Sequence, residues 1–382
     1  MILQNQDFQE RITRVQQIIA GTDLDAVLVF STESEPAGVR YFADYWPSFE
    51  TCAVIIPKQG PAALLIGPES LTYAQSRSRL PDIIQVMDFR ESSQPDYPGS
   101  PHPDWPEILG RFKIRKLGLA GWYMFPYPIM VKIQKALGGP EQVVEADDII
   151  NRVRIQKMPC ELQCLRQAAK ISEIGFRAVL EKIKPGMSEV ELCGIATAAM
   201  LANGAEATGY PIWCCSGPNS NQAISRPSLR KVQKSEIIHF SIGAKCEGYS
   251  ASIGRPVVLG PCPENIRRLM QVGLEASDLT FELMQAGEHS GTVASKIHAF
   301  VKQQGYGHAL LYGPAHGCGQ MECEYPFLET SSTYTLEENM VFMADMFLYE
   351  NGMGLRWEDG LIVRRGRAEK LSSFARELLI LN

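Results

Sequence analysis

The sequence lacks a hydrophobic run long enough to cross a lipid bilayer. The charge-free stretch 207–225 contains Gly, Pro, Asn, Ser and Gln, so it does not fit a membrane span. The first residues, MILQNQDFQER, lack the basic segment followed by an apolar core that marks an export signal. We therefore expect no membrane partner and a location in the cytoplasm.

Excess positive charge is also missing. Lys and Arg number 37 and Asp and Glu number 43, so the formal net charge is −6, and no basic block is present. A nucleic-acid partner would need a basic surface. Neither a GxxxxGK[ST] loop nor a strand-bound GxGxxG occurs, so no nucleotide cradle is expected. These absences exclude nucleic acid as an expected partner.

Cysteine is too infrequent for a disulfide scaffold, since the chain of 382 residues contains only 10. The closely spaced pairs Cys160/Cys164, Cys214/Cys215 and Cys318/Cys323 do not have CxxC spacing. We expect reduced thiols that serve mainly in packing.

The chain is long enough for two domains, and its pattern changes after Asp147. Before that point, short apolar runs alternate with helical patterns, which indicates a sheet covered by helices. The expected strands there are 26–30, 52–57, 62–67, 82–89, 116–121 and 143–146, with helices near 8–19 and 126–137. The Pro-rich stretch 94–106 is expected to be an exposed loop. We place the domains at 1–150 and 151–382.

The second part begins with two expected helices, 158–184 and one that starts at Ser188. Glu191, three positions after Ser188, completes a capping box. Strand-like runs then dominate, namely IIHFSIGA, PVVLG, MVFMADMFLY and GLIVRR, and helices near 263–285 and 291–304 interrupt them.

From about Arg154 to Leu371 the sequence resembles the creatinase, prolidase and aminopeptidase P family (M24-like). The resemblance rests on motifs in family order, which are IKPGMSEVEL, PIWCCSGPNSN, FSIGAKCEGYSASIGRP, GPAHGCGQMECEYP, ENMVFMADM and LRWEDGLIV. It implies an α+β pita-bread C-terminal domain preceded by an α/β creatinase-type N-terminal domain. It also implies a homodimer.

In the metal-dependent members of that family, two aspartates, a histidine and two glutamates hold two divalent ions. The resemblance places Ser241 and Ser252 at the aspartate positions, and His316, Asp345 and Glu358 at the other three. Two neutral hydroxyls replace two carboxylates, so the charge of two ions would be poorly balanced. We therefore expect no two-metal site.

Our main expectation is a site without a metal cofactor, and the alternative is one divalent ion on His316, Asp345 and Glu358. The base histidine of the metal-free relative creatinase is also missing, because Ile224 or Ser225 stands at that point. A second family histidine corresponds to Cys323, whereas Glu324 keeps the acid that follows it.

His316 lies between glycines in GPAHGCG, where the backbone can approach a ligand closely. We expect it to transfer protons near neutral pH. The residues expected to be catalytic are His316, Glu324 and Glu358. The residues expected to bind the substrate are Asp345, Ser241, Ser252, Arg255 and Trp213. In the alternative interpretation, the two acids at 345 and 358 are former ligands that pair with Arg255 and Arg356.

Three hypotheses for the function follow from the resemblance. The first is a metal-independent hydrolase that cleaves a C–N bond in a small amino-acid-like or guanidino-like molecule. The second is a non-catalytic protein of the same fold that binds a ligand or peptide. The third is an Xaa-Pro dipeptidase-like metallopeptidase with one atypical metal. Each takes a small molecule or a short peptide as its ligand.

Overall fold

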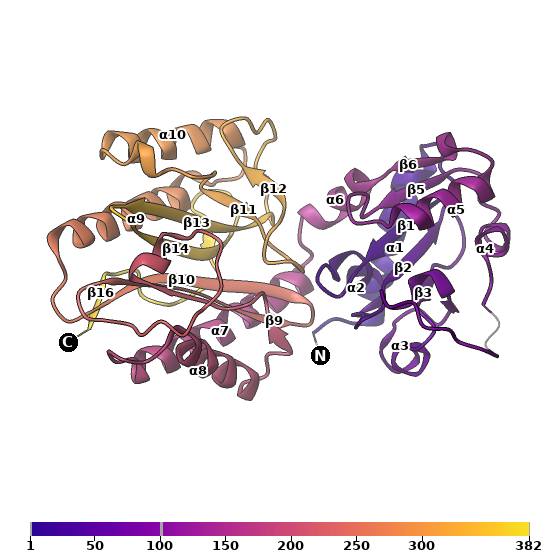
Figure 1. The fold of residues 1–382 in the computed structure, drawn as a ribbon. Helices are drawn as coiled ribbons and strands as arrows, with labels where there is room; N and C mark the ends of the chain where they lie inside the picture. The colour runs from indigo at the N-terminus through magenta and orange to yellow at the C-terminus, as the bar shows by residue number, and fades with distance from the viewer. Residues whose placement is uncertain (1, 100–101, 382) are drawn as a thin grey trace. The chain divides into compact units, whose positions relative to one another are not determined.

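The computed structural model describes residues 2–99 and 102–381 (Figure 1). The chain divides into two compact units, Leu3–Arg154 and Ile155–Asn382. The boundary expected after residue 150 falls within helix α6 (Asp147–Ile155), which ends at this division.

The first unit contains a six-stranded sheet in the order β4-β3-β2-β1-β5-β6. Its strands are β1 (Ala26–Ser31), β2 (Cys52–Pro57), β3 (Ala63–Ile66), β4 (Ile83–Gln85), β5 (Leu117–Ala120) and β6 (Val143–Glu145). β1 runs antiparallel to β2 and parallel to β5, so the sheet is mixed. Every residue of β1 and β2 is buried, as the apolar runs of the sequence predict.

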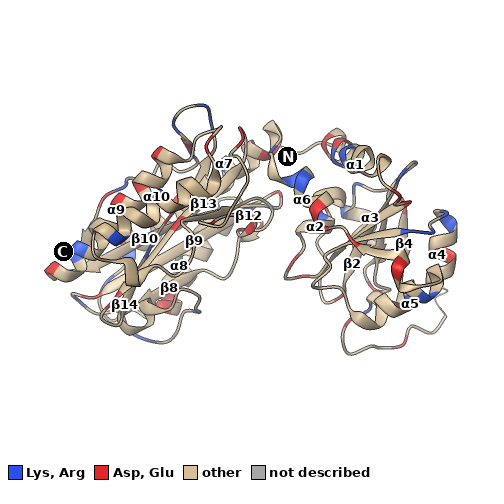
Figure 2. Ribbon diagram, turned by 90° about the horizontal axis from the view of Figure 1, so that it is seen from above, with Lys and Arg blue, Asp and Glu red and all other residues tan. Residues whose placement is uncertain are grey.

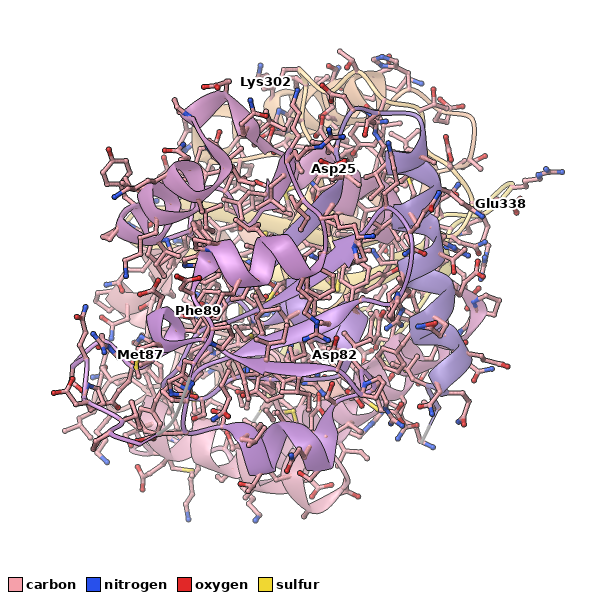
Figure 3. The ribbon with its side chains drawn as sticks, turned by 90° about the vertical axis from the view of Figure 1, so that its right-hand side faces the viewer. Asp25, Asp82, Met87, Phe89, Lys302 and Glu338 are labelled. Carbon is pink, nitrogen blue, oxygen red and sulfur yellow. The ribbon has the colours of Figure 1, made fainter. Side chains whose placement is uncertain are left out.

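Helices cover both faces of this sheet. They are α1 (Asn5–Ala20), α2 (Ala37–Ala43), α3 (Leu71–Arg77), α4 (Trp105–Arg111), α5 (Tyr127–Leu137) and α6, with the 3₁₀ turns η1 (Met87–Phe89) and η2 (Pro140–Gln142). Val27 and Val29 pack in one apolar cluster with α1, whereas Leu28 and Phe30 pack in another with α4 and α5. Phe89 of η1, labelled in Figure 3, is buried in the second cluster. The alternation along β1 therefore gives the α/β unit that the sequence predicts.

Four short helices of this unit, α2, α3, α4 and α6, were not predicted from the sequence. α4 begins at Trp105, inside the stretch 94–106 that we expected to be a loop, and residues 100 and 101 of that stretch lie outside the described residues. Asp104 caps α4 and forms a capping box with Glu107. A seven-residue helix is too short to show a period, so the cap was the available signal.

The second unit contains a ten-stranded sheet in the order β12-β11-β13-β14-β10-β9-β7, to which β8, β15 and β16 add at β9, β14 and β10. Its strands are β7 (Ala207–Thr208), β8 (Trp213–Ser216), β9 (Ile237–Cys246), β10 (Tyr249–Leu259), β11 (Ala315–Gly317), β12 (Glu324–Leu328), β13 (Val341–Glu350), β14 (Met353–Ile362), β15 (Glu369–Lys370) and β16 (Leu379–Leu381). The long antiparallel hairpin β13–β14 turns at Asn351 and Gly352, which both have positive φ. Asn-Gly is the favoured pair for such a two-residue turn.

The helices of this unit pack on the sheet in two pairs. They are α7 (Pro159–Lys182), α8 (Glu189–Ala202), α9 (Glu264–Leu283) and α10 (Ser290–Gln303), with the 3₁₀ turns η3 (Gly217–Asn221) and η4 (Gly307–Ala309). Residues of α7 and α8 share an apolar cluster with β9 and β10, and residues of α9 and α10 share one with β13 and β14. Ser188 caps α8 and Glu191 closes the capping box, which confirms that prediction.

The strands of the second unit bury apolar side chains on one face and carry polar ones on the other. Phe240 and Ile242 of β9 pack in the cluster of α7 and α8, so Ser241 between them points to the opposite face. In the same way, Ala344 and Met346 pack in the cluster of α9 and α10, and Asp345 points away. The polar face therefore positions the candidate site.

Lys and Arg are interspersed with Asp and Glu along both units (Figure 2). Among the described residues, no helix combines the length and apolar character that a bilayer span requires.

Candidate functional site

Strand pairing brings the side chains of the site together. Asp345 of β13 lies opposite Glu358 of β14, and Glu358 in turn lies opposite Gly254 of β10. Gly254 pairs with Ser241 of β9, and Ser252 is two residues away on β10. Paired residues and residues two apart share a face, so these strands point their polar side chains into one space.

Glycine makes room for two of these side chains. A Cβ atom at Gly254 would lie 2.6 Å from Cβ of Glu358, so a larger residue there would displace that carboxylate. A Cβ atom at Gly243 would lie 2.9 Å from Cε1 of Tyr210. The two strand glycines therefore admit Glu358 and Tyr210 to the polar face.

His316, Glu322 and Glu358 form a group that can hold a metal ion. One ligand atom from each lies within 4.8 Å of those of the other two. His316 and Glu358 are buried, at 9% and 1% exposed, and Glu322 is half-buried. Nδ1 of His316 lies 3.1 Å from the carbonyl oxygen of Gly317, and a carbonyl only accepts, so this nitrogen carries a proton. Nε2 is therefore the nitrogen left for an ion, which is the usual arrangement of a metal-binding histidine.

The pKa values of the two carboxylates of this group are shifted in opposite directions. Burial and the charge of Glu358 raise the pKa of Glu322 well above its usual value. Burial also acts to raise the pKa of Glu358, but hydrogen bonds from Glu322 and Ser241 and the charge of Arg356 outweigh it, so this pKa is lowered. A buried and a half-buried carboxylate this close together favour a bound positive charge, which a divalent ion can supply.

Hydroxyl groups fix the orientation of Glu358. Ser252 donates a hydrogen bond to Oε1 at 2.8 Å, and Ser241 donates one to Oε2. The hydroxyl of Tyr210 bonds to the hydroxyl of Ser241. Since Ser241 donates to Glu358, Tyr210 is the donor in that second bond. The two serines at the family's aspartate positions thus serve as donors to one glutamate.

Asp345 forms an ion pair with Arg356 beside the group. Oδ2 of Asp345 accepts from Nη1 of Arg356 and, at 3.0 Å, from the hydroxyl of Tyr312. The same oxygen lies 3.9 Å from Nε2 of His316. Burial acts to lower the pKa of Arg356, but the charge of Asp345 outweighs it and the pKa is raised. The ring of Trp213 lies 4.8 Å from the guanidinium.

The donor set fits one divalent ion held by His316, Glu322 and Glu358. One imidazole and two carboxylates suit a borderline divalent metal ion. The set expected for a single ion had Asp345 where the structure has Glu322. Asp345 is instead paired with Arg356, as the alternative interpretation of the sequence has it.

Glu324 lies apart from this group, although we expected it to be catalytic. Its carboxylate accepts a hydrogen bond at 2.9 Å from Nζ of Lys157, and both side chains are buried. This ion pair joins β12 to the segment that precedes α7. We therefore assign Glu324 to the support of the fold.

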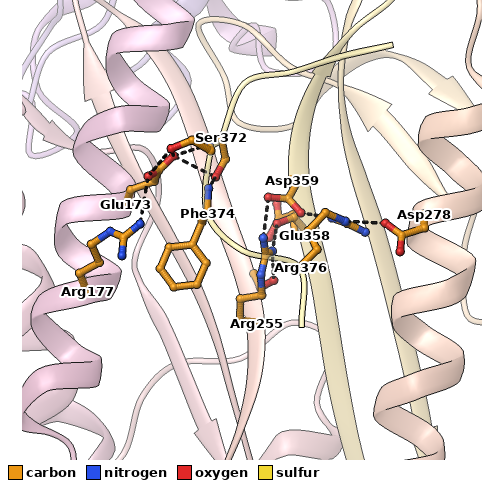
Figure 4. Close-up of polar contacts among 11 residues, drawn as sticks. Glu173, Arg177, Arg255, Asp278, Glu358, Asp359, Ser372, Phe374 and Arg376 are labelled. Atoms are coloured by element: carbon orange, nitrogen blue, oxygen red, sulfur yellow. Dashed lines mark hydrogen bonds and ion pairs between the residues drawn. The ribbon is translucent and has the colours of Figure 1, made fainter. Parts of the chain in front are cut away.

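Arg255, which we expected to bind the substrate, lies instead in a network of ion pairs (Figure 4). It is fully buried, and its Nη2 donates to Asp359 at 2.9 Å while Nη1 donates to the main-chain oxygens of Gly254 and Glu358. Arg376 binds the same Asp359 from the other side and also binds Asp278. This network ties the strands together, so the expected role of Arg255 in substrate binding finds no support.

Glu322 was not among the site residues predicted from the sequence. It stands next to Cys323 in the MECEYP segment, at a position for which the family resemblance supplied no ligand. The sequence did contain one indication of a role for Glu322. Glu322 and Glu324 flank Cys323, the residue that replaces a family histidine. Sequence alone could not tell which of these two acids faces His316, because this depends on the bulge between β11 and β12.

Comparisons with known proteins agree with this architecture. Residues 163–365 match the model of metallopeptidase family M24, and residues 11–156 match that of the creatinase/prolidase N-terminal domain. An Xaa-Pro dipeptidase of Pyrococcus furiosus is 25% identical over 374 residues, which cover 97% of this chain and 100% of that protein. An Xaa-Pro dipeptidase of Lactobacillus delbrueckii is 24% identical over 91% of this chain and 94% of its own length.

Solved structures show the same fold. An X-Pro aminopeptidase of Thermotoga maritima superposes with a TM-score of 0.85 and 23% identity, over 97% of this chain and 99% of that one. A prolidase of Pyrococcus horikoshii gives 0.83 and 22%, over 97% and 100%. The expected pita-bread fold with a creatinase-type N-terminal domain is confirmed.

One expectation is overturned by these matches. We expected a site without a metal cofactor, yet the matching family is one of metallopeptidases. That expectation was wrong because it considered only the ligand positions of the family, where two neutral serines replace two charged aspartates. The carboxylate of Glu322 was not among those positions.

Proposed function

Since the chain belongs to metallopeptidase family M24, we propose that it is a metal-dependent dipeptidase that cleaves short peptides of the Xaa-Pro type. The observation that carries this proposal is the group formed by His316, Glu322 and Glu358 on the polar face of the sheet. The names of its relatives support the substrate class, because several of them are Xaa-Pro dipeptidases.

In this proposal the three residues of the group hold one divalent ion. Such an ion, when bound, lowers the pKa of a water molecule and polarises a carbonyl group. Nε2 of His316 would hold the ion, because Nδ1 is engaged with Gly317. Ser241 and Ser252 keep both oxygens of Glu358 in place.

The surrounding residues would shape the peptide-binding site. Arg356 is held by Asp345 and by the carbonyl oxygen of Ala223 at 2.7 Å, so it is a fixed positive charge. Tyr312 and Trp213 flank this ion pair. Burial raises the pKa of Tyr312 well above its usual value, so its phenol stays protonated and keeps its hydrogen bond to Asp345. We assign these groups to binding and orienting the peptide.

The proposal is tested with the purified chain, freed of metal and then loaded separately with Mn²⁺, Co²⁺ or Zn²⁺. Release of free proline from Ala-Pro is measured, and Ala-Ala serves as the comparison substrate. We expect ion-dependent cleavage of Ala-Pro that a chelator abolishes.

The Glu322→Gln variant should lose this activity, and Glu324→Gln should retain most of it. Absence of cleavage with every ion, in a protein that binds the ion, would contradict the peptidase proposal. Retention of full activity after complete removal of metal would contradict the metal-dependent mechanism.

Two other expectations from the sequence remain proposals, namely a homodimer and a location in the cytoplasm. Light scattering on the eluate of a size-exclusion column would measure the mass in solution and decide between monomer and dimer.

A further inference from the structure

Arg356 is held on three sides within the site. Nη1 binds Asp345, Nη2 donates to the carbonyl oxygen of Ala223, and the ring of Trp213 covers the guanidinium. Only 5% of the residue is exposed. Guanidinium groups stay charged at all ordinary pH values, so the positive charge is permanent.

This charge lies close to the ion-binding group. Arg356 is two residues from Glu358 on β14, so both side chains point to the same face. Oδ2 of Asp345, which Arg356 binds, is 3.9 Å from Nε2 of His316. A single carboxylate oxygen therefore separates the guanidinium from the nitrogen that faces the ion.

The charges of the site balance one divalent ion. With their carboxylates ionised, Glu322, Glu358 and Asp345 contribute −3 and Arg356 contributes +1, which gives −2 with His316 neutral. One dication makes the site neutral, and a second one would leave it at +2. Ser241 and Ser252 add no charge, since both are hydroxyl donors to Glu358.

We propose that Arg356 is a built-in second cation, which limits the site to one divalent ion and sets the affinity for that ion through the net charge. This inference rests on the ion site of the proposed function. Asp345 thereby has a different role from the one its sequence position implies. It anchors the guanidinium and leaves the ion to the other three residues.

The test is a charge series in the full-length chain, titrated with Mn²⁺ by calorimetry, with the number of bound ions counted by native mass spectrometry. Wild type, at −2, should bind one ion. Arg356→Met, at −3, should bind it at least about tenfold more tightly, and Asp345→Asn, at −1, at least about tenfold more weakly. The double variant Arg356→Met/Asp345→Asn returns to −2, and its affinity should be within about threefold of wild type.

Arg356→Lys keeps the charge and serves as the matched control, with an affinity close to that of wild type. Thermal melting checks that each variant folds, and if Arg356→Met does not fold, the pair Arg356→Lys and Asp345→Asn decides the question. Two ions in wild type, or equal affinities across the series, would overturn the inference. Two ions together with cleavage of Ala-Pro would leave the proposed function standing, whereas no bound ion in wild type would overturn both.

Discussion

The hydroxyl of Ser252 lies 2.8 Å from Oε1 of Glu358 and donates a hydrogen bond to it. Ser241 donates to the other oxygen of the same carboxylate. Glu358 therefore keeps its negative charge in a buried site, since charge-assisted hydrogen bonds partly replace its hydration. Two neutral residues thus preserve one ligand while they reduce the number of ions that the site can neutralise.

Replacing both serines by aspartate should restore a second ion. The variant Ser241→Asp/Ser252→Asp changes the charge of the site from −2 to −4, which two dications balance. We expect elemental mass spectrometry to find two ions per chain after loading with Mn²⁺ and desalting. Ser241→Asn/Ser252→Asn has the same size without the charge and should keep one ion. Equal ion content in the two variants would contradict the charge argument.

Glu322 and Glu324 should respond differently to the same substitution. Glu322→Gln removes a ligand, and we expect the affinity for Mn²⁺ to fall by about 100-fold or more. Glu324→Gln breaks the buried ion pair with Lys157 and should lower the free energy of unfolding by about 3–5 kcal/mol, with ion binding kept. Calorimetric titration measures the first effect and urea unfolding the second. If only the Glu324 variant lost ion binding, Glu324 would be the ion ligand and Glu322 would not.

Ion binding should become stronger as the pH rises. Burial acts to lower the pKa of His316, but its hydrogen bond with Cys323 and the charges of Asp345 and Glu358 outweigh this effect and raise the pKa to about 9. At neutral pH the ion-free site therefore carries a proton on His316, which an ion must displace. Between pH 6 and 8, each proton that the ion displaces should raise the affinity for Mn²⁺ by about tenfold per pH unit.

Cys323→Ala provides the control for that experiment. Removal of the thiol takes away the hydrogen bond that raises the pKa of His316, so this pKa should fall. The affinity at pH 7 should then increase, and its dependence on pH should move to lower values. An affinity that is flat between pH 6 and 8 in wild type would show that no proton is displaced.

Glu189 should control the order of the segment that holds Arg356. It is fully buried and accepts hydrogen bonds from the main chain and side chains of Ser216 and Ser228, at 2.7–2.9 Å. Ala223, whose carbonyl oxygen binds Arg356, lies between these serines in the chain. Glu189→Ala leaves several buried donors unsatisfied, and we expect a loss of about 3 kcal/mol or more in urea unfolding.

Glu191→Ala gives the comparison for Glu189, since both acids lie in the first turn of α8. Glu191 is exposed and acts in the capping box with Ser188, so its loss should cost about 1 kcal/mol. Similar costs for the two variants would show that Glu189 has no special role in this segment.

The sequence predicts the elements whose pattern is local. The run Cys52–Pro57 is strand β2 in full, and Ser188 with Glu191 marks the start of α8, because burial and capping leave clear periods and spacings. Helices of seven residues, such as α2 and α3, leave no such period. The family motifs likewise locate His316 and Glu358 without information from the fold.

The partners of the site residues could not be predicted in the same way. Asp345 and Arg356 both stand in motif segments, yet their ion pair depends on the register in which Asp345 faces Glu358 across the hairpin. Glu322 reaches the site from the segment before β12, after an irregularity in strand pairing that no local pattern encodes. Interactions that depend on strand register and irregular segments become visible only in three dimensions.

The hairpin β13–β14 also determines which changes in chain length the site can tolerate. Arg356 and Glu358 share a face because they are two positions apart on the strand, with only Trp357 between them, and Asp345 meets them through continuous pairing from Val341 to Glu350. Deletion of Trp357 would place Arg356 and Glu358 on opposite faces, so that the guanidinium and the ligand would separate even though no polar residue is lost. Insertions and deletions should therefore accumulate at the Asn351–Gly352 turn, and within the strands they should be tolerated only two residues at a time.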